Sequence, residues 1–389
     1  MASPRPTTIV VGCGVVGLTT AIRLLESDDR FLVHILAEHF PLDPLDPEYA
    51  SSAAGAHHLS FAADQDFRQR GLDARTFEIM WDELEAEEIT GGEPSGLMRL
   101  TQTEYYDGKE KHIDFVSGLP DFVIHPASSL PDFATHSVSF TSITVAPSQY
   151  FRRLLARFHH LGGKLHRVHL TSLREALTHV SGHAPKAIIV CAGIGSLHLK
   201  GVEDTDIYPT RGQVLLLRAP WCRSGWTHQI GSLDGGEGGA RTYVIPRFNG
   251  QVIIGGTRDA NDWHRDARSE TTLDILARAL KICPFLAPPA VRLSDRTPVP
   301  ADILPLIEAE IVGFRPSRKP QSPADSGLRL ERGDSLSSDD GDVAVVYNYG
   351  HGGFGWQSCW GCAEAVVELL GGSKAPEISH KFRKAAGLA

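Results

Sequence analysis

The chain has 389 residues, about twice the length of a typical single domain, so it can bury one large core or two interleaved ones. Hydrophobic residues make up 42% and charged residues 22%, which is typical of a folded globular protein. The net charge of −9, with scattered basic residues, argues against nucleic acid or an anionic membrane as the main partner and favours a small molecule. No run of 18 or more apolar residues occurs, so we expect no membrane-spanning helix.

The N-terminal segment can be interpreted as a signal peptide or as a nucleotide-binding turn. Arg5 precedes an apolar run, as in a signal peptide. However, residues 8–11 are typical of a buried parallel strand, and the following GCGVVG sequence at 12–17 opens a helix with apolar periodicity. Residues 31–37 predict a second strand that ends at Glu38. This strand, helix and strand order favours the nucleotide-binding turn.

Each glycine of this turn has a separate physical role. Gly12 permits the tight turn, Gly14 lets the backbone approach a diphosphate, and Gly17 lets the helix pack closely on the strand. The diphosphate then lies at the helix N-terminus, where free N–H groups and the helix dipole favour negative charge. Glu38 can accept hydrogen bonds from ribose hydroxyls, and its charge disfavours a 2′-phosphate, so FAD or NAD is favoured over NADP.

The middle of the chain alternates between two kinds of pattern. Small residues at 50–58 predict a loop against a flat ligand, and residues 67–87 predict a helix. Short antiparallel strands are expected between 97 and 138, in a second domain on the substrate side. A helix, a strand and a buried strand that return to the first domain are predicted at 147–161, 164–171 and 187–193. Further strands and a helix of the substrate side are predicted at 208–217, 241–246, 251–257 and 272–282.

The C-terminal part carries a second glycine-rich turn. Residues 317–342 are rich in Pro, Ser, Asp and Arg and predict a surface loop with a short strand at 328–331. A strand at 343–347, the sequence GHGGFG at 350–355 and a helix at 356–370 follow. This turn can place backbone N–H groups beside an electron-rich ring edge, or it can be an ordinary connection between strand and helix.

The six cysteines are spread along the chain, so we expect reduced thiols rather than a disulfide framework. Cys359 and Cys362 form a CxxC pair, but no second CxxC and no histidine cluster accompanies them. We therefore predict no metal site.

Several motifs occur in an order and spacing that are specific. They are VGCGVVG at 11–17, AEHF at 37–40, SSAAGA at 51–56, RGQV at 211–214, YVIP at 243–246, GGTR at 255–258, GFRP at 313–316, YGHGGFG at 349–355 and WG at 360–361. In these motifs the sequence resembles the D-amino acid oxidase and D-aspartate oxidase family of flavoproteins, over nearly the whole chain.

The resemblance implies an α/β fold in which a Rossmann-like FAD-binding domain is interleaved with an α+β substrate-binding domain built on a mostly antiparallel sheet. The FAD-binding domain is expected at 1–55, 140–203 and 303–389, and the substrate-binding domain at 56–139 and 204–302. The resemblance also implies non-covalent FAD. The residues expected to bind it are Gly12, Gly14, Val15, Val16, Gly17, Glu38, His39, Ser51, Ser52, Gly55, Ala56, Val168, Ala192, Gly193, Arg315, Gly352, Gly353, Phe354, Gly355, Trp356 and Gln357.

Four of the matching positions are implied to be catalytic, three of them through contacts with the substrate. Arg315 would hold the α-carboxylate in a bidentate fork, and Tyr243 would hydrogen-bond the same group. Gly353 would accept a hydrogen bond from the substrate amine through its carbonyl, and Gln357 could reach the flavin or water. Without the resemblance, Arg315 could be a surface arginine and Tyr243 an ordinary core aromatic.

The implied reaction is hydride transfer from the Cα of a D-amino acid to flavin N5. The imino acid formed hydrolyses to a 2-oxo acid and ammonia, and oxygen reoxidises the flavin to give hydrogen peroxide. No general base is needed if the substrate enters with a neutral amine, so the protein contributes orientation and electrostatics.

Three positions bear on which D-amino acid is used. Arg258 resembles the D-aspartate oxidase branch, where an arginine binds the side-chain carboxylate, although it could also be a strand-end residue facing water. His58 would line the active site near the side chain, whereas the adjacent His57 and His58 do not form a metal site because consecutive side chains point apart. The glycine-rich residues 235–239 suggest a more open entrance.

Two alternatives stay open. A glycine or sarcosine-type amine oxidase shares the first motif, and a non-catalytic flavin- or NAD-binding regulator would bind the cofactor without turnover. Relatives are usually peroxisomal, but the chain ends in AGLA rather than a Ser-Lys-Leu-like tripeptide, so a cytosolic location is the alternative. A homodimer is possible.

Overall fold

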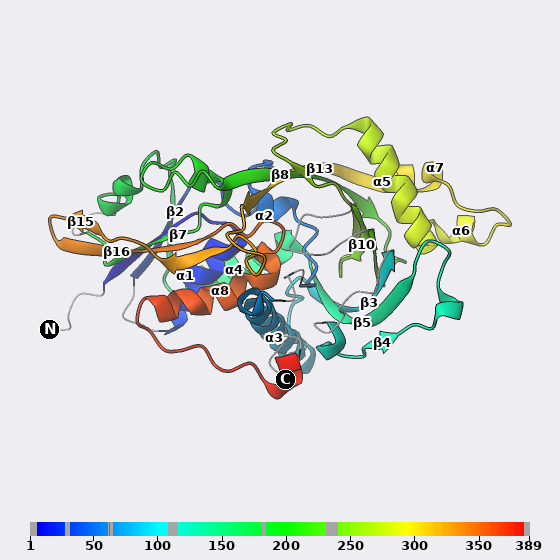
Figure 1. Ribbon diagram of the computed structural model, residues 1–389, viewed down its shortest axis with the longest axis horizontal. Helices are drawn as coiled ribbons and strands as arrows, with labels where there is room; N and C mark the ends of the chain where they lie inside the picture. Colours follow the sequence, from blue (N-terminus) through cyan, green and yellow to red (C-terminus); the bar gives the residue numbers. More distant parts are fainter. Residues whose placement is uncertain are drawn as a thin grey trace.

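Two β-sheets lie toward opposite ends of the long axis of the molecule, with helices around them (Figure 1). The computed structural model describes residues 6–27, 32–60, 62, 65–107, 116–180, 184–230 and 240–384. One sheet is mainly parallel and the other mainly antiparallel, so the predicted α/β architecture of two interleaved sheet regions is confirmed.

The first sheet has the strand order β14-β16-β7-β1-β2-β6, and β15 pairs with β16. The strands from β16 to β6 are parallel, and β14 and β15 run antiparallel to β16. The bounds are β1 (Thr7–Val11), β2 (Leu32–Ala37), β6 (Lys164–Arg167), β7 (Ala187–Val190), β14 (Arg329–Arg332), β15 (Leu336–Ser338) and β16 (Gly341–Tyr349). All four residues of β7 are buried, because helices and loops cover both faces of this sheet.

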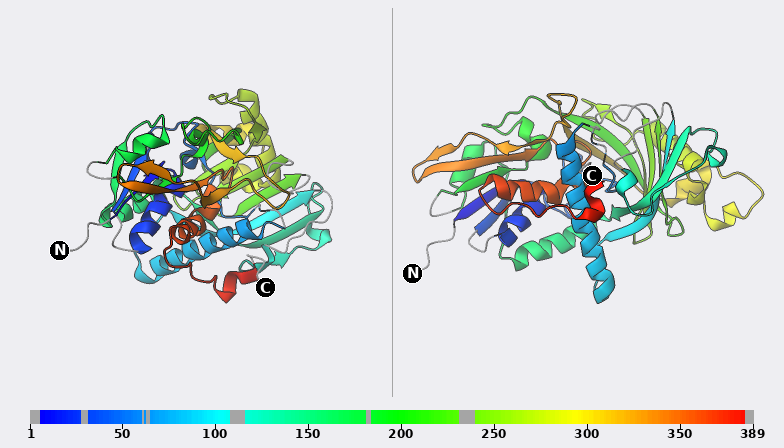
Figure 2. Two further views of the ribbon diagram at one scale, coloured as in Figure 1. Left: turned by 60° about the vertical axis from the view of Figure 1, so that its left-hand side comes forward. Right: turned by 60° about the horizontal axis from the view of Figure 1, so that its bottom comes forward.

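The helices around the first sheet pack on one another as well as on the strands. Their bounds are α1 (Val15–Ser27), α2 (Ala50–Ala53), α3 (Phe67–Thr90), α4 (Pro147–His160), α8 (Gly355–Leu369) and α9 (His380–Arg383). Helix α1 contacts α4 and α8, and the long helix α3 lies against α8 and α9 (Figure 2). The Asp66 side chain caps α3 by accepting a hydrogen bond from the Gln69 backbone N–H.

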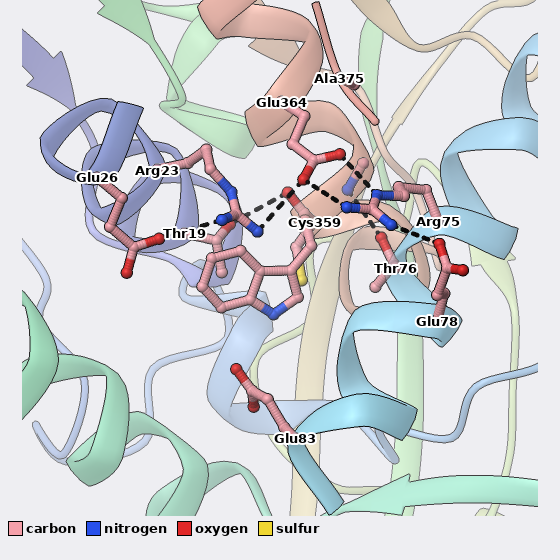
Figure 3. Close-up of polar contacts among 12 residues, drawn as sticks. Thr19, Arg23, Glu26, Arg75, Thr76, Glu78, Glu83, Cys359, Glu364 and Ala375 are labelled. Carbon is pink, nitrogen blue, oxygen red and sulfur yellow. Dashed lines mark hydrogen bonds and ion pairs between the residues drawn. The ribbon is translucent and has the colours of Figure 1, made fainter. Parts of the chain in front are cut away.

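A buried carboxylate joins three of these helices. Glu364 of α8 lies between Arg75 of α3, whose Nε is 2.8 Å from Glu364 Oε2, and Arg23 of α1, 3.3 Å away (Figure 3). The Thr19 hydroxyl of α1 also donates to the Cys359 carbonyl of α8 at 3.2 Å. The helix that starts at the first glycine turn is thus fixed to the helix that starts at the second.

The second sheet has the strand order β12-β8-β11-β10-β9-β3-β5-β4, and β13 pairs with β8. Only the β3–β9 pair is parallel among the described strands of this sheet. The bounds are β3 (Leu97–Asp107), β4 (Val123–Ile124), β5 (His136–Val145), β8 (Ile207–Arg218), β9 (Gly225–Ile230), β10 (Ala240–Pro246), β11 (Gln251–Gly255), β12 (Asp259–Ala260) and β13 (Ile307–Arg318).

The two faces of the second sheet differ because strand residues alternate between faces. Leu215 and Val244 belong to a core cluster with Ile275 and Leu276 of α5 (Ser269–Ile282), which covers the outer face. Their neighbours Val214, Tyr243 and Ile245 line a cavity on the other face. The remaining short helices are α6 (Pro289–Arg292), α7 (Pro300–Ile303), η1 (Val116–Gly118), η2 (Ala127–Ser129), η3 (Leu173–Leu177), η4 (Gly193–Leu197), η5 (Pro284–Leu286) and η6 (Leu304–Leu306).

Some predicted element bounds differ from the structure. The strand predicted at 164–171 ends at Arg167, because the chain then leaves the sheet edge and Val168 lines the cavity. The short strand predicted at 328–331 within the surface loop at 317–342 is present as β14, whereas the end of β13 and the strand β15 in this segment were not predicted.

The predicted domain bounds stay a prediction, and two strands do not follow them. Strand β13 lies in the segment 303–389 expected in the FAD-binding domain, but it is hydrogen-bonded to β8 of the second sheet. Strand β5 spans the expected boundary at residue 140 and pairs with β3 of the same second sheet. Within the described residues, no helix is both long and apolar enough to cross a bilayer.

Candidate active site

A cavity of about 720 Å³ lies between the two sheets, and its walls come from both. The volume is in the range of cofactor and small-molecule sites. Almost all of the predicted site residues line it, although they are scattered from residue 12 to residue 357. They are Gly12, Gly14, Val15, Val16, Glu38, His39, Ser51, Gly55, Ala56, Val168, Ala192, Gly193, Tyr243, Arg258, Arg315, Gly352, Gly353, Phe354, Gly355, Trp356 and Gln357.

The first glycine turn lines the cavity. Gly12 has a φ of +103°, and a Cβ at this position would lie 2.4 Å from the Cys191 carbonyl oxygen. Gly17 does not line the cavity. Its role is packing, because a Cβ there would meet the Gly12 carbonyl oxygen at 2.1 Å. The turn therefore brings the N-terminus of α1, with its N–H groups, to the cavity surface.

Ser51 lies at the same helix N-terminus. Its Oγ accepts a hydrogen bond from the Val15 N–H at 3.0 Å, and its carbonyl accepts one from Trp356 Nε1 at 3.0 Å. Ser51 thus contacts both glycine turns. Ser52, the next residue, does not line the cavity among the residues described.

Glu38 lies where β2 ends, as the sequence predicted for a ribose-binding carboxylate. Its Oε2 is 2.6 Å from His169 Nδ1, and its carbonyl accepts a hydrogen bond from Arg167 at 2.8 Å. Both side chains of the Glu38 and His169 pair are more than half exposed, so a ligand hydroxyl can compete for the carboxylate. His169 was not predicted.

The second glycine turn also lines the cavity. Helix α8 begins at Gly355, and the Gly352 N–H donates to the Pro316 carbonyl at 2.9 Å. Gln357 donates through Nε2 to the Leu59 carbonyl at 2.6 Å, whereas its buried Oε1 has no hydrogen-bond partner in the described part of the chain. Burial lowers the pKa of His351 to about 3, so this cavity-lining imidazole is neutral at physiological pH.

Arg315 on β13 points into the cavity from the second sheet. Its guanidinium donates to the Thr257 carbonyl at 3.0 Å and lies over Gly212 of the paired strand β8. A Cβ on Gly212 would lie 2.5 Å from an Arg315 nitrogen, so the absence of a side chain at this position makes room for the guanidinium. Arg315 is half-buried and is therefore not the freely exposed surface arginine of the alternative interpretation.

Tyr243 and Arg258 lie in the same wall. Tyr243 on β10 is half-buried, with its ring against Gly255 and Gly256 at the end of β11. Arg258 follows β11 and is also half-buried. Arg315, Arg258 and Tyr243 thus bring two guanidinium groups and a phenol to one cavity.

The structure differs from the expectation for the two adjacent histidines. His58 was expected to line the site, but its Nε2 is 2.9 Å from the Asp73 carbonyl and 3.1 Å from the Gln357 carbonyl, and it is outside the cavity lining described. His57 lines the cavity instead, because consecutive residues of an extended segment point to opposite sides. Burial, with a smaller contribution from Arg241, lowers the pKa of His57 to about 3.

Sequence reasoning also missed an ion pair in this wall. Arg241 lines the cavity two residues before Tyr243, and its guanidinium is 3.2 Å from Oε2 of Glu104 on β3. The strand period of two would have placed Arg241 on the same face as Tyr243, but nothing in the sequence pairs residue 104 with residue 241.

Some features singled out in the sequence lie outside the described residues or outside the cavity lining. The glycine-rich residues 235–239 and the terminal AGLA sequence lie outside the described residues. All six cysteines are buried free thiols in the described chain, and within it Cys359 and Cys362 stay out of the cavity lining. The described His, Cys, Asp and Glu residues form no group suited to a metal ion.

Comparison with known proteins shows which family has this set of cavity residues. A family model described as FAD dependent oxidoreductase matches residues 7–369. The chain is 49% identical to a D-aspartate oxidase of Cryptococcus neoformans var. grubii, over 95% of this chain and 97% of the relative. It is 30% identical to a D-amino-acid oxidase of Schizosaccharomyces pombe, over 93% of this chain and 95% of the relative.

The chain belongs to the D-amino acid oxidase family of FAD-dependent oxidoreductases. The predictions of this family, of FAD as cofactor and of a flavoprotein oxidase are confirmed. Among solved structures, glycine oxidase from Geobacillus kaustophilus superimposes with a TM-score of 0.67, at 18% identity and covering 98% of both chains. That similarity shows the fold alone.

The residues present fit FAD. The Gly12 turn opens a helix N-terminus suited to a diphosphate, and Glu38 stands at the distance along the chain that a ribose carboxylate requires. Buried polar atoms of cavity-lining residues also have no partner within the described chain, namely His57 Nε2, His351 Nε2 and Gln357 Oε1. A polar ligand in the cavity would give these atoms partners.

Proposed function

We propose that this protein carries out FAD-dependent oxidative deamination of D-amino acids and prefers those with an acidic side chain, D-aspartate and D-glutamate. The proposed preference rests on Arg258, because this second arginine lines the same cavity as Arg315 and Tyr243. The 49% identical D-aspartate oxidase supports the same choice of substrate.

Arg315 and Tyr243 bind the substrate α-carboxylate. A guanidinium can bind a carboxylate with two parallel hydrogen bonds, and the Tyr243 phenol adds a third donor from β10 of the same sheet. The Thr257 carbonyl and the space over Gly212 hold the Arg315 guanidinium in place before the substrate arrives. This preorganisation lowers the entropy lost when the substrate binds.

The amine faces the second glycine turn. The Gly353 carbonyl accepts a hydrogen bond from it, and the Oε1 atom of Gln357 is a second acceptor in the same wall. His57 and His351 are neutral at physiological pH, so neither adds a positive charge to the cavity. The chain therefore orients the Cα–H bond by holding the two groups attached to Cα.

Bound FAD supplies the oxidising chemistry, since it accepts a hydride equivalent from Cα and passes two electrons to oxygen, which gives hydrogen peroxide. The contribution of this chain is to hold the substrate, to fix its orientation and to exclude bulk water through the apolar residues between the two sheets.

Arg258 binds the side-chain carboxylate of an acidic substrate. It belongs to the segment that follows β11, next to Thr257, whose carbonyl holds Arg315, so the two guanidinium groups lie in one wall. Each can therefore take one carboxylate of a dicarboxylic substrate. A neutral D-amino acid leaves Arg258 without this anion and gains less from binding.

The test replaces the Arg258 side chain with an uncharged side chain of similar length. For Arg258→Met, we expect the ratio of kcat/KM for D-aspartate over D-alanine to fall about 10- to 200-fold, with bound FAD retained. Oxygen consumption measures the ratio, and visible absorption measures FAD. Arg218→Met, a half-exposed arginine at the end of β8, is the matched control and should leave the ratio unchanged. An Arg258→Met ratio equal to that of the parent protein would refute the side-chain role.

A further inference from the structure

A buried ion pair lies in the cavity wall that the second sheet forms. Arg241 of β10 and Glu104 of β3 are 3.2 Å apart, and their side chains are 8% and 1% exposed. Arg241 occurs two residues before Tyr243 on the same strand, so both side chains are on the cavity face of the sheet. Strand β9 separates the two partners, with Thr227 paired to Tyr243 on one side and to Glu104 on the other.

Burying these two charged groups costs free energy, so a contribution to stability alone explains the pair poorly. Burial raises the pKa of Glu104, and the nearby Arg241 only offsets part of that effect. Burial likewise lowers the pKa of Arg241. Buried ion pairs can often be replaced by apolar side chains without loss of stability, whereas perturbed charged groups gather at binding sites.

The neighbours of Glu104 fix its position. Gln102 donates through Nε2 to Glu104 Oε1 at 2.7 Å and to the Thr227 hydroxyl at 2.9 Å. Glu104 is therefore held from one side and anchors Arg241 from the other. A guanidinium has five N–H donors in a planar fork. Arg241 uses it to bind Glu104 and also donates to Gln229 Oε1 at 3.5 Å, and it still lines the cavity, where it can contact a carboxylate.

The backbone of Arg241 lies beside the segment that leads to Arg258. The Gly256 N–H donates to the Arg241 carbonyl at 3.3 Å, and Tyr243 is paired with Gly255, so β10 and the start of the Arg258 segment are neighbours. Both arginines line the cavity. Arg315 alone can bind the α-carboxylate, so Arg241 and Arg258 are two further cations in the same wall.

We propose that Arg241, anchored by Glu104, binds the side-chain carboxylate of an acidic D-amino acid together with Arg258. This inference rests on the proposed function, because it identifies a further residue for the same substrate. Arg241 is a specificity residue that contacts the substrate, and Glu104 is a positioning residue that acts through Arg241. Glu104 also tunes the site, because its negative charge weakens the attraction of Arg241 for a second carboxylate.

The test changes Arg241 and Glu104 together. Arg241→Gln alone leaves Glu104 buried without its cation, so the double variant Arg241→Gln, Glu104→Gln keeps polar side chains of similar size and removes both charges. We expect it to retain FAD and to raise KM for D-aspartate at least about 10-fold, with a smaller effect on kcat. The ratio of kcat/KM for D-aspartate over D-alanine should fall by a similar factor.

A binding measurement separates Arg241 from turnover. Malonate carries two carboxylates and no amine, and its Kd can be read from the perturbed visible absorption of the bound flavin. The double variant should bind malonate at least about 10-fold more weakly than the parent. Glu104→Gln alone should bind malonate more tightly than the parent, because Arg241 then lacks its counter-charge. Arg218→Gln is the control and should behave as the parent does.

The outcomes distinguish the two proposals. A parent protein that oxidises D-aspartate no faster than D-alanine overturns the proposed preference, and the malonate titration still decides on Arg241. A parent that prefers D-aspartate, with a double variant whose KM and malonate Kd stay within about twofold, leaves the proposed function intact and overturns the role of Arg241.

Discussion

The two walls of the cavity are built by different means. The wall on the parallel sheet consists of backbone at strand ends, two glycine turns and the N-termini of α1 and α8. The wall on the antiparallel sheet consists of long polar side chains from separate strands, namely Arg241 and Tyr243 of β10 and Arg315 of β13, together with Arg258. Backbone geometry fits a cofactor that many proteins share, whereas side chains set which substrate one protein accepts.

This contrast predicts different failures when each wall is altered. A change in the backbone wall should abolish FAD binding and, with it, everything else. A change in the side-chain wall should leave the protein yellow and alter only the substrate step. The following substitutions are ordered by the size of the expected effect.

The largest effect is expected at Gly12. For Gly12→Ala, the new Cβ would lie 2.4 Å from the Cys191 carbonyl oxygen at a φ of +103°, so the turn must open and the helix N-terminus must move. We expect a colourless protein whose affinity for added FAD, measured by quenching of flavin fluorescence, is at least about 100-fold weaker. Gly71→Ala is the control, since a Cβ there meets nothing within 4 Å. Normal FAD content in Gly12→Ala would contradict the backbone role.

Arg315 should give the next largest effect, in the opposite wall. Arg315→Ala should keep bound FAD but lose turnover, because removing one partner of a desolvated charge pair costs about 3–5 kcal/mol. This corresponds to a loss of kcat/KM of about 10²- to 10³-fold or more for every D-amino acid. FAD content and oxygen consumption are measured on the same sample. Turnover close to that of the parent would remove Arg315 from the carboxylate site.

Gly212 tests whether the position of Arg315 matters as well as its charge. In Gly212→Ala the new Cβ would clash with the guanidinium at 2.5 Å, so Arg315 shifts while its charge stays. A displacement of about 1 Å at a reacting centre can cost about 100-fold, and we expect a rise in KM of about 10- to 100-fold with FAD retained. Steady-state kinetics against the Gly71→Ala control would measure it. An unchanged KM would mean that the carboxylate is held elsewhere.

The smallest effect concerns the pH dependence of stability. Asp73 of α3 is buried, and Ser60 and Gln69 donate to its carboxylate at 2.6 Å. Burial raises its pKa from 3.8 to about 7. The folded protein therefore keeps this proton to a higher pH than the unfolded chain does. The stabilisation is complete below about pH 4 and is lost as the pH rises through about 7.

For Asp73→Asn we therefore expect a flatter decline of Tm between pH 5 and 8, with the difference from the parent amounting to roughly a few degrees. Differential scanning calorimetry of the FAD-loaded protein at a series of pH values measures this slope. If parent and variant lose stability in parallel over that interval, the buried carboxyl does not titrate there.

The sequence revealed the backbone wall more fully than the side-chain wall. Gly12, Gly17 and Glu38 lie at fixed spacings within one stretch of chain, so their relation is local and could be predicted. Arg315 and Tyr243 were identified only through resemblance to a family, since their strands meet through β8, β11 and β10 of the sheet. The pairing of Glu104 with Arg241 depends on the parallel register of β3 and β9, which no local pattern encodes.

The histidines illustrate a second limit. The sequence showed that His57 and His58 point in opposite directions, but the choice between them required knowing which side of the segment faces the cavity. The backbone of His58 pairs with the Ile143 carbonyl, and its ring lies toward α3 and α8. His57 consequently faces the cavity, on the side of Arg241. The side of a strand that becomes buried is decided by tertiary packing.

The most direct test of the proposed function is to mix the FAD-loaded parent protein anaerobically with D-aspartate and, separately, with D-alanine, and to follow the loss of visible flavin absorption. We predict complete bleaching by both substrates, with D-aspartate faster by about 10-fold or more at equal low concentration. A flavin that stays oxidised with both, or bleaching by D-alanine as fast as by D-aspartate, would contradict it.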